Sequence, residues 1–129
     1  MSNRFVGRII LTAALLLLYA GESRADVDCN SIVACAWPTD WSPGHYNPAF
    51  QMAITGSFSL EADLFIDANC SSVYFSGPVD GVQYGLVTFE YALETMMNPG
   101  DSSSWKIRVA GCPETACLTA VAGADDCPR

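Results

Sequence analysis

The stretch that most constrains the fold is residues 57–67, SFSLEADLFID, in which apolar and polar side chains alternate. The apolar positions share one side of an extended strand: Phe58, Leu60, Ala62, Leu64 and Ile66. The polar positions share the other side, interrupted by Phe65: Ser57, Ser59, Glu61, Asp63 and Asp67. A strict period of two is typical of a half-buried β-strand, whereas a helix would scatter these residues around its circumference. We therefore predict a strand with one face on a core and one acidic face in water.

Similar alternation recurs along the chain in segments separated by turn-forming sequences: 49–55, 72–76, 82–94 and 104–110. Residues 118–122 could form a last short strand. Gly56 is expected to separate two strands by a tight turn or bulge. Asp80-Gly81, within GPVDG at 77–81, is a strong hairpin signal. Within the mixed segment 26–36, residues 32–34 fit either an edge strand or one helical turn. We predict an all-β fold: a small disulfide-stabilised β-sandwich, immunoglobulin-like or jelly-roll-like, with six or seven short strands. A small barrel is the alternative.

The N-terminus has the features of a secretory signal peptide. Arg4 and Arg8 precede the largely apolar run at 9–20, and the SRA sequence at 23–25 offers small residues where a signal peptidase reads them. The run is 12 residues long, and a bilayer-spanning helix needs about 20. We predict cleavage after residue 25, with an uncleaved anchor as the alternative. A single β domain at 26–129 would then be secreted, to the extracellular space or the periplasm, without membrane attachment.

Cysteine usage supports the same compartment. All six cysteines follow the predicted signal: Cys29, Cys35, Cys70, Cys112, Cys117 and Cys127. An even number in a small exported chain indicates three disulfides, whose connectivity the sequence does not determine. The turn-forming residues between Cys112 and Cys117 favour that pair, Cys35–Cys70 is a second expectation, and Cys29–Cys127 would tie the two ends.

The predicted mature domain is strongly acidic. Without residues 1–25 the chain has 3 basic and 13 acidic residues, a net charge of −10 against −8 for the whole chain. Such a surface repels nucleic-acid phosphates and anionic lipid, so we predict no nucleic-acid partner. Glu61, Asp63 and Asp67 could suggest calcium, but alternate strand residues lie about 7 Å apart and no calcium-loop spacing is present. We expect a solvated acidic face, no metal site and no cofactor.

Residues 37–48, WPTDWSPGHYNP, combine three prolines with a glycine and are predicted to form a loop. This loop gathers the candidate binding residues: Trp37, Trp41, His45 and Tyr46. Aromatic side chains on a rigid loop can stack on sugar rings or fill a pocket of a protein partner. Alternatively, they fold back and close one end of the domain.

Catalytic chemistry is not indicated. His45 is the only imidazole, and neither a nucleophile elbow nor a glycine-rich phosphate loop is present. We therefore predict no enzyme activity and no catalytic residues. The loop at 95–104, TMMNPGDSSS, could present Met96 and Met97 as the bait of a protease inhibitor, or both could pack on the core. Asn69-Cys70-Ser71 fits the N-glycosylation pattern.

Residues 105–112, WKIRVAGC, resemble a late strand of fibronectin-type or immunoglobulin-like domains. Residues 44–70 resemble the start of secreted pilus and spore-coat-like subunits. These likenesses are short and carry no site residue, so they assign no family. The predicted function is a secreted, non-enzymatic binding or interaction domain that recognises a glycan or a protein through its aromatic loop. A secreted protease inhibitor, or a structural subunit of an extracellular assembly, is the alternative.

Overall fold

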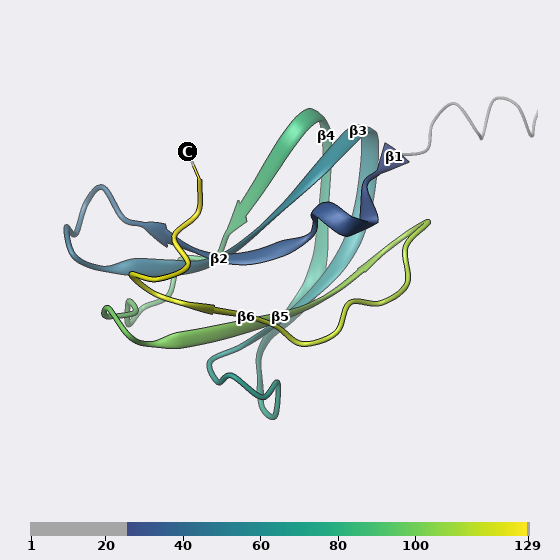
Figure 1. Ribbon diagram of the computed structural model, residues 1–129. Coiled ribbons are helices and arrows are strands. Elements are labelled where there is room, and N and C mark those ends of the chain that lie inside the picture. Colours follow the sequence, from purple (N-terminus) through teal and green to yellow (C-terminus); the bar gives the residue numbers. More distant parts are fainter. Residues whose placement is uncertain (1–25, 129) are drawn as a thin grey trace, which may run out of the picture.

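The computed structural model describes residues 26–128. Their six strands form one antiparallel sheet that curls into a half-barrel (Figure 1). The elements are β1 (Asp26–Val27), the 3₁₀ helix η1 (Cys29–Ser31), β2 (Val33–Pro38), β3 (Tyr46–Phe65), β4 (Val73–Glu90), β5 (Ser102–Val109) and β6 (Leu118–Val121). The all-β class and the strand number are confirmed. The described strands belong to one curled sheet and do not form two separate packed sheets, so the predicted sandwich is not confirmed. The predicted signal peptide, 1–25, lies outside the described residues.

The sheet is built around β3, which is 20 residues long. One edge of β3 pairs with β4 along most of its length, and the opposite edge is shared in turn by β2, β1 and β5. β6 extends the sheet beyond β5. After β6, Asp126 bridges to Ala36 of β2, so the C-terminal segment returns beside β2 and helps to close the curl (Figure 1). β4 pairs with β3 alone among the described strands and is therefore an edge strand.

The alternation predicted for residues 57–67 is confirmed along most of that stretch. Leu60, Ala62 and Leu64 are buried, and Phe58 packs against the same core. A bulge between Leu64 and Phe65 then shifts the register. Because a bulge turns the following side chains to the opposite face, Phe65 is buried and Ile66 is 44% exposed. The expectation that Ile66 faces the core is therefore wrong.

The predicted break at Gly56 is wrong as well, since β3 continues through this residue as a paired strand. The backbone φ angles of Gly56 and Gly85 are +91° and +96°, in the region that glycine adopts without steric cost. Gly56 pairs with Gln83, and Gly85 pairs with Ile54, so the two glycines lie at neighbouring levels of the β3–β4 hairpin. At this level both strands arch over together (Figure 1), and the hairpin curves around the core without losing its pairing.

The hairpin predicted at Asp80-Gly81 is not found. Residues 77–81 lie inside β4, paired with residues 58–62, and the chain reverses at 66–72 instead. A Cβ at Gly81 would lie 2.9 Å from the Phe58 ring, and a Cβ at Gly77 would lie 3.2 Å from the Phe75 ring. These two glycines thus give space to aromatic rings on the inner face of the sheet.

The core lies between the arched hairpin and β5. The predicted strand at 104–110 is confirmed as β5, with Trp105, Ile107 and Val109 buried as expected. The Trp105 ring contacts Phe50 edge-on, with centroids 5.0 Å apart, and it also meets Phe89 at 5.9 Å. The last predicted strand is confirmed as β6.

The six cysteines form three disulfides, as predicted, but none of the three expected pairs is correct. The bonds are Cys29–Cys112, Cys35–Cys127 and Cys70–Cys117. The segment between Cys112 and Cys117 does not close a small loop, because Thr115 bonds Ile107 through both its backbone N–H and its hydroxyl oxygen. This contact holds the segment along β5 and leaves its two cysteines to reach distant partners.

The three disulfides indicate an oxidising compartment. In the part of the chain that the structure describes, no helix is long and apolar enough to cross a membrane.

Candidate binding surfaces

The aromatic loop is shorter than expected, because Trp37 and Tyr46 belong to strands β2 and β3. Trp37 packs on the Cys35–Cys127 disulfide, and Tyr46 packs on the main core while its backbone bonds Met97 in both directions. The structure therefore does not gather the four predicted residues on one exposed surface. Their role in binding stays a prediction.

Trp41 is the exposed member of this set, with 68% of its surface open to solvent. The loop beneath it is held by internal hydrogen bonds. Thr39 donates its hydroxyl to the Ser42 carbonyl at 2.6 Å, and the His45 Nδ1 atom lies 3.0 Å from the Ser42 hydroxyl. Trp41 thus stands on a loop whose own contacts fix its shape.

The loop at 95–104 is anchored to the fold. Met97 is 3% exposed and forms a backbone bridge with Tyr46. Gly100 donates its N–H to the Ala122 carbonyl at 2.8 Å, which ties the loop to the end of β6. Met96 is partly buried and lines an open cavity next to Tyr74. Met97 therefore packs on the core, as in the alternative to a protease-inhibitor bait loop.

The acidic face of β3 is partly neutralised by β5. Arg108 forms a fork with Asp63, with nitrogen–oxygen distances of 2.7 and 3.1 Å, and it approaches Glu61 at 3.3 Å. The Arg108 guanidinium, helped by the Ser76 hydroxyl, holds the pKa of Asp63 below its usual range. The Ser71 hydroxyl likewise lowers the pKa of Asp67. Within residues 26–128, no group of three or more His, Cys, Asp or Glu side chains is placed to hold a metal ion.

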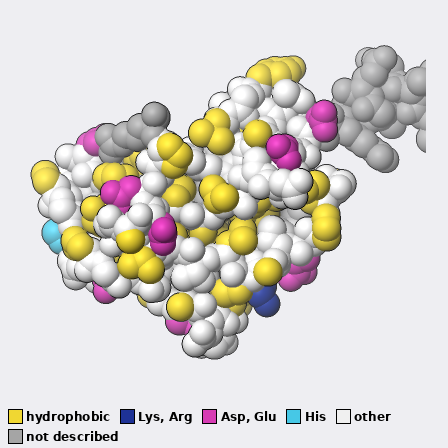
Figure 2. Space-filling view, in the orientation of Figure 1, with side chains coloured by type: hydrophobic (Ala, Val, Ile, Leu, Met, Phe, Trp, Pro, Cys, Tyr) yellow, Lys and Arg dark blue, Asp and Glu magenta, His cyan; other side chains and the backbone are white. Residues whose placement is uncertain are grey.

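The largest accumulation of exposed apolar side chains lies on β4, which the sequence analysis did not single out. Eight large hydrophobic side chains are exposed in the described residues, and five of them belong to β4: Val73, Tyr74, Val82, Tyr84 and Leu86. Tyr84 is the most exposed, at 75%. Figure 2 shows hydrophobic side chains over the crest of the β3–β4 arch. Exposed apolar side chains that gather on one stretch of a strand, as Val82, Tyr84 and Leu86 do, mark a candidate interaction site.

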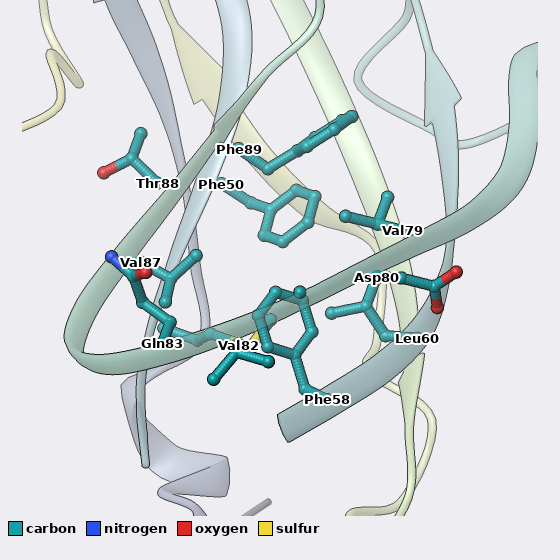
Figure 3. A pocket seen from close by; sticks show the side chains of 12 residues that line it. Phe50, Phe58, Leu60, Val79, Asp80, Val82, Gln83, Val87, Thr88 and Phe89 are labelled. Carbon is teal, nitrogen blue, oxygen red and sulfur yellow. The ribbon is translucent and has the colours of Figure 1, made fainter. Parts of the chain in front are cut away.

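A cavity of about 290 Å³ opens inside the bend of the same strand. Its walls come from two arms of β4, residues 79–83 and 87–89, and from the inner face of β3. Figure 3 shows the Phe50 and Phe58 rings and the Val79 and Val87 side chains around this space. The cavity therefore offers an apolar interior directly beside the unpaired edge of β4.

Asp80 is the one charged residue among the described residues that line this cavity. The ion pairs within residues 26–128 are those of Arg108 with Glu61 and Asp63, so Asp80 has no cationic partner there. The lysine and arginine of this part of the chain, Lys106 and Arg108, both lie on β5, which pairs with the opposite edge of β3. The β4 side of the molecule is consequently apolar and acidic.

A sequence signal for this surface does exist. Val82, Tyr84 and Leu86 alternate with Gln83 and Gly85, which is the pattern of a strand face. That pattern cannot tell which face lies on the core, and the opposite face of β4 carries Val79, Val87 and Phe89 as well. No protein-family model matches this chain, and no curated protein shows significant sequence similarity to it.

Proposed function

We propose that this protein is a secreted, non-enzymatic binding domain whose main binding surface is β4 with the adjoining cavity. The observation that carries this proposal is the concentration of exposed Val82, Tyr84 and Leu86 on a strand whose outer edge is unpaired among the described residues. Aromatic side chains on a rigid scaffold, here Tyr84, are frequent anchors of protein interfaces, and apolar neighbours such as Val82 and Leu86 exclude water around them. The three disulfides supply such a scaffold.

A second candidate is glycan binding at the tip of the loop between β2 and β3. The supporting observation is the 68% exposure of Trp41 on a loop fixed by its own hydrogen bonds. An exposed indole can stack on a sugar ring. The two candidates use surfaces on different elements, so one set of variants separates them.

The test is to screen the folded, oxidised protein against a displayed random-peptide library and a glycan array. Ligands are then measured against the double variant Tyr84→Ser/Leu86→Ser and against Trp41→Ser. We expect peptide ligands whose affinity falls at least about tenfold in the double variant and is unchanged in Trp41→Ser. Because these side chains are exposed, each variant should change the free energy of unfolding by only about 0.5 kcal/mol.

Glycan ligands that depend on Trp41 alone would favour the second candidate. A screen in which no ligand depends on either surface would contradict both.

A further inference from the structure

The outer edge of β4 carries few of the devices that usually protect an edge strand, and its charged side chains are Asp80 and Glu90 alone. Such edges are blunted by proline, by lysine or by covering segments. β4 has one proline, Pro78, and no lysine or arginine, and residues 79–90 contain none of these three residue types. No other described strand pairs with this edge. The backbone N–H and C=O groups of alternate residues along 79–87, those that point away from β3, are therefore placed to accept an added strand.

The size and lining of the cavity fit a side chain of such a strand. Its volume of about 290 Å³ is at the lower limit of pockets that hold small molecules, which start at about 300 Å³. Its position between the two arms of β4 puts it next to the edge where an added strand would lie. A side chain pointing inward from that strand would meet Phe58, Val79 and Val87, so an apolar side chain suits it best.

The charges on β4 indicate which kind of added strand would bind best at its edge. Asp80 borders the cavity, but its exposed carboxylate points away from the Phe50 and Phe58 rings (Figure 3), toward the face that carries Val82, Tyr84 and Leu86. It has no cation beside it within residues 26–128. A second copy of this chain would bring another β4 with Asp80 and Glu90 and without a lysine or arginine. Like charges across a strand pair are destabilising. A segment with lysine or arginine at its ends would instead complement Asp80.

We propose that the edge of β4 binds an extended cationic–apolar peptide segment by strand addition, with one apolar side chain in the cavity and a cation beside Asp80. This inference rests on the proposed function and names the chemistry of its partner. Backbone pairing supplies affinity in this mode, and side chains at alternate positions supply specificity.

The probes are three synthetic peptides based on acetyl-KTVFVTVTK-amide. The second has glutamate at both lysine positions, and the third carries N-methyl groups on alternate backbone amides along one edge. Binding to the full disulfide-bonded protein is measured by fluorescence polarisation at low salt, and the contacted residues are located by NMR amide shifts. The variants are Asp80→Lys and, as a matched control on the loop after β5, Glu114→Lys, which makes the same change in net charge.

We expect the lysine peptide to bind about threefold more tightly than the glutamate peptide, as for an exposed ion pair. Asp80→Lys should reverse this preference, and Glu114→Lys should keep it. N-methylation should weaken binding by at least about tenfold, since several backbone hydrogen bonds are lost. Amide shifts should concentrate in residues 79–87.

Three results would overturn the inference: equal or tighter binding of the glutamate peptide, no effect of N-methylation, or no binding of any peptide at its solubility limit. Concentration-dependent dimerisation that Val82→Lys abolishes would identify a second copy as the occupant and would overturn it too. Library ligands that depend on Tyr84 and Leu86 but carry acidic ends would overturn this inference while leaving the proposed function intact.

Discussion

At the scale of single residues, the clearest electrostatic feature is the fork between Arg108 and Asp63. The Asp63 side chain is 15% exposed and that of Arg108 is 34% exposed, so the pair is better shielded than an ordinary surface ion pair. The Ser76 hydroxyl donates to the same carboxylate at 2.6 Å. Bidentate geometry of this kind is stronger than a single contact. The fork therefore holds β5 to β3 from the solvent side of the sheet.

We predict that Asp63→Asn lowers the free energy of unfolding by about 1 kcal/mol at neutral pH. The pKa of Asp63 is lowered in the folded protein, so the stabilisation is present above the pKa of the unfolded chain and is lost as the pH falls. The difference between wild type and variant should shrink below about pH 4. Urea unfolding at several pH values measures it, with Asp80→Asn as a control expected to show little change. A difference that persists undiminished at low pH would contradict this account.

The binding residues show where prediction from sequence reaches its limit. The prolines at 37–48 predict a loop, and residues 39–45 in the middle of this range do form irregular structure. Which aromatic side chains turn inward depends on the strands that enter and leave the loop. Trp37 and Tyr46 are paired residues of β2 and β3, and their side chains pack against the protein, whereas the Trp41 side chain is exposed to solvent. The loop sequence has no periodic pattern that distinguishes the inward side chains of Trp37 and Tyr46 from the exposed side chain of Trp41.

At the scale of secondary structure, the β3–β4 hairpin depends on its glycine bend. Nothing lies within 4 Å of a Cβ built on Gly85, so the obstacle to a side chain there is the φ angle of +96° alone. We predict that Gly85→Ala costs about 1–3 kcal/mol of stability through backbone strain. Gly85→Asn should cost less, because asparagine tolerates positive φ better. Thermal unfolding of the wild type, Gly85→Ala and Gly85→Asn tests this. An unchanged melting temperature in Gly85→Ala would contradict the positive φ angle at this position.

The same hairpin explains which elements could be predicted from sequence. Alternation correctly places β5 and the inward face of the second half of β3, because the burial of one face leaves an apolar residue at every second position. The glycines predict turns that the structure does not contain, at Gly56 and at Gly81. A glycine can occur in a turn, in a bend of a continuous strand, or where a neighbouring ring needs space. Gly81 looked like a hairpin residue beside Asp80, but it pairs with Phe58 and lies beneath its ring. That neighbour is remote in sequence and becomes apparent only once the strands are paired.

At the scale of the whole molecule, the disulfides connect regions far apart in the chain. Their sequence separations are 83, 92 and 47 residues. In the chain-entropy model each contributes about 4–5 kcal/mol, and an ordinary domain has a total stability of about 5–15 kcal/mol. We predict that reduction unfolds the protein at room temperature, which circular dichroism before and after reductant would reveal. Retention of the native spectrum after complete reduction would contradict this.

The connectivity has its own test. Digestion of the unreduced protein with proteases that cut at acidic residues, followed by mass spectrometry, should yield two cross-linked species, because no acidic residue separates Cys29 from Cys35. One joins the 29–40 peptide to the peptides that carry Cys112 and Cys127, and the other joins Cys70 to Cys117. Fragmentation of the first species between Cys29 and Cys35 should assign Cys112 to Cys29 and Cys127 to Cys35. A peptide joining Cys112 to Cys117 would contradict the arrangement. The number of disulfides could be predicted from the even count of cysteines, but their partners follow from the way the sheet curls, which periodicity does not encode.

This connectivity also bears on how the protein is made. No native disulfide joins two cysteines that are neighbours in sequence order. A chain oxidised as it emerges would first present Cys29 and Cys35 to each other, and that bond is not native. Cys35 finds its native partner only when Cys127 has been synthesised. Efficient production should therefore depend on an isomerase that reshuffles early bonds, and a host that supplies only an oxidant should accumulate misbridged protein.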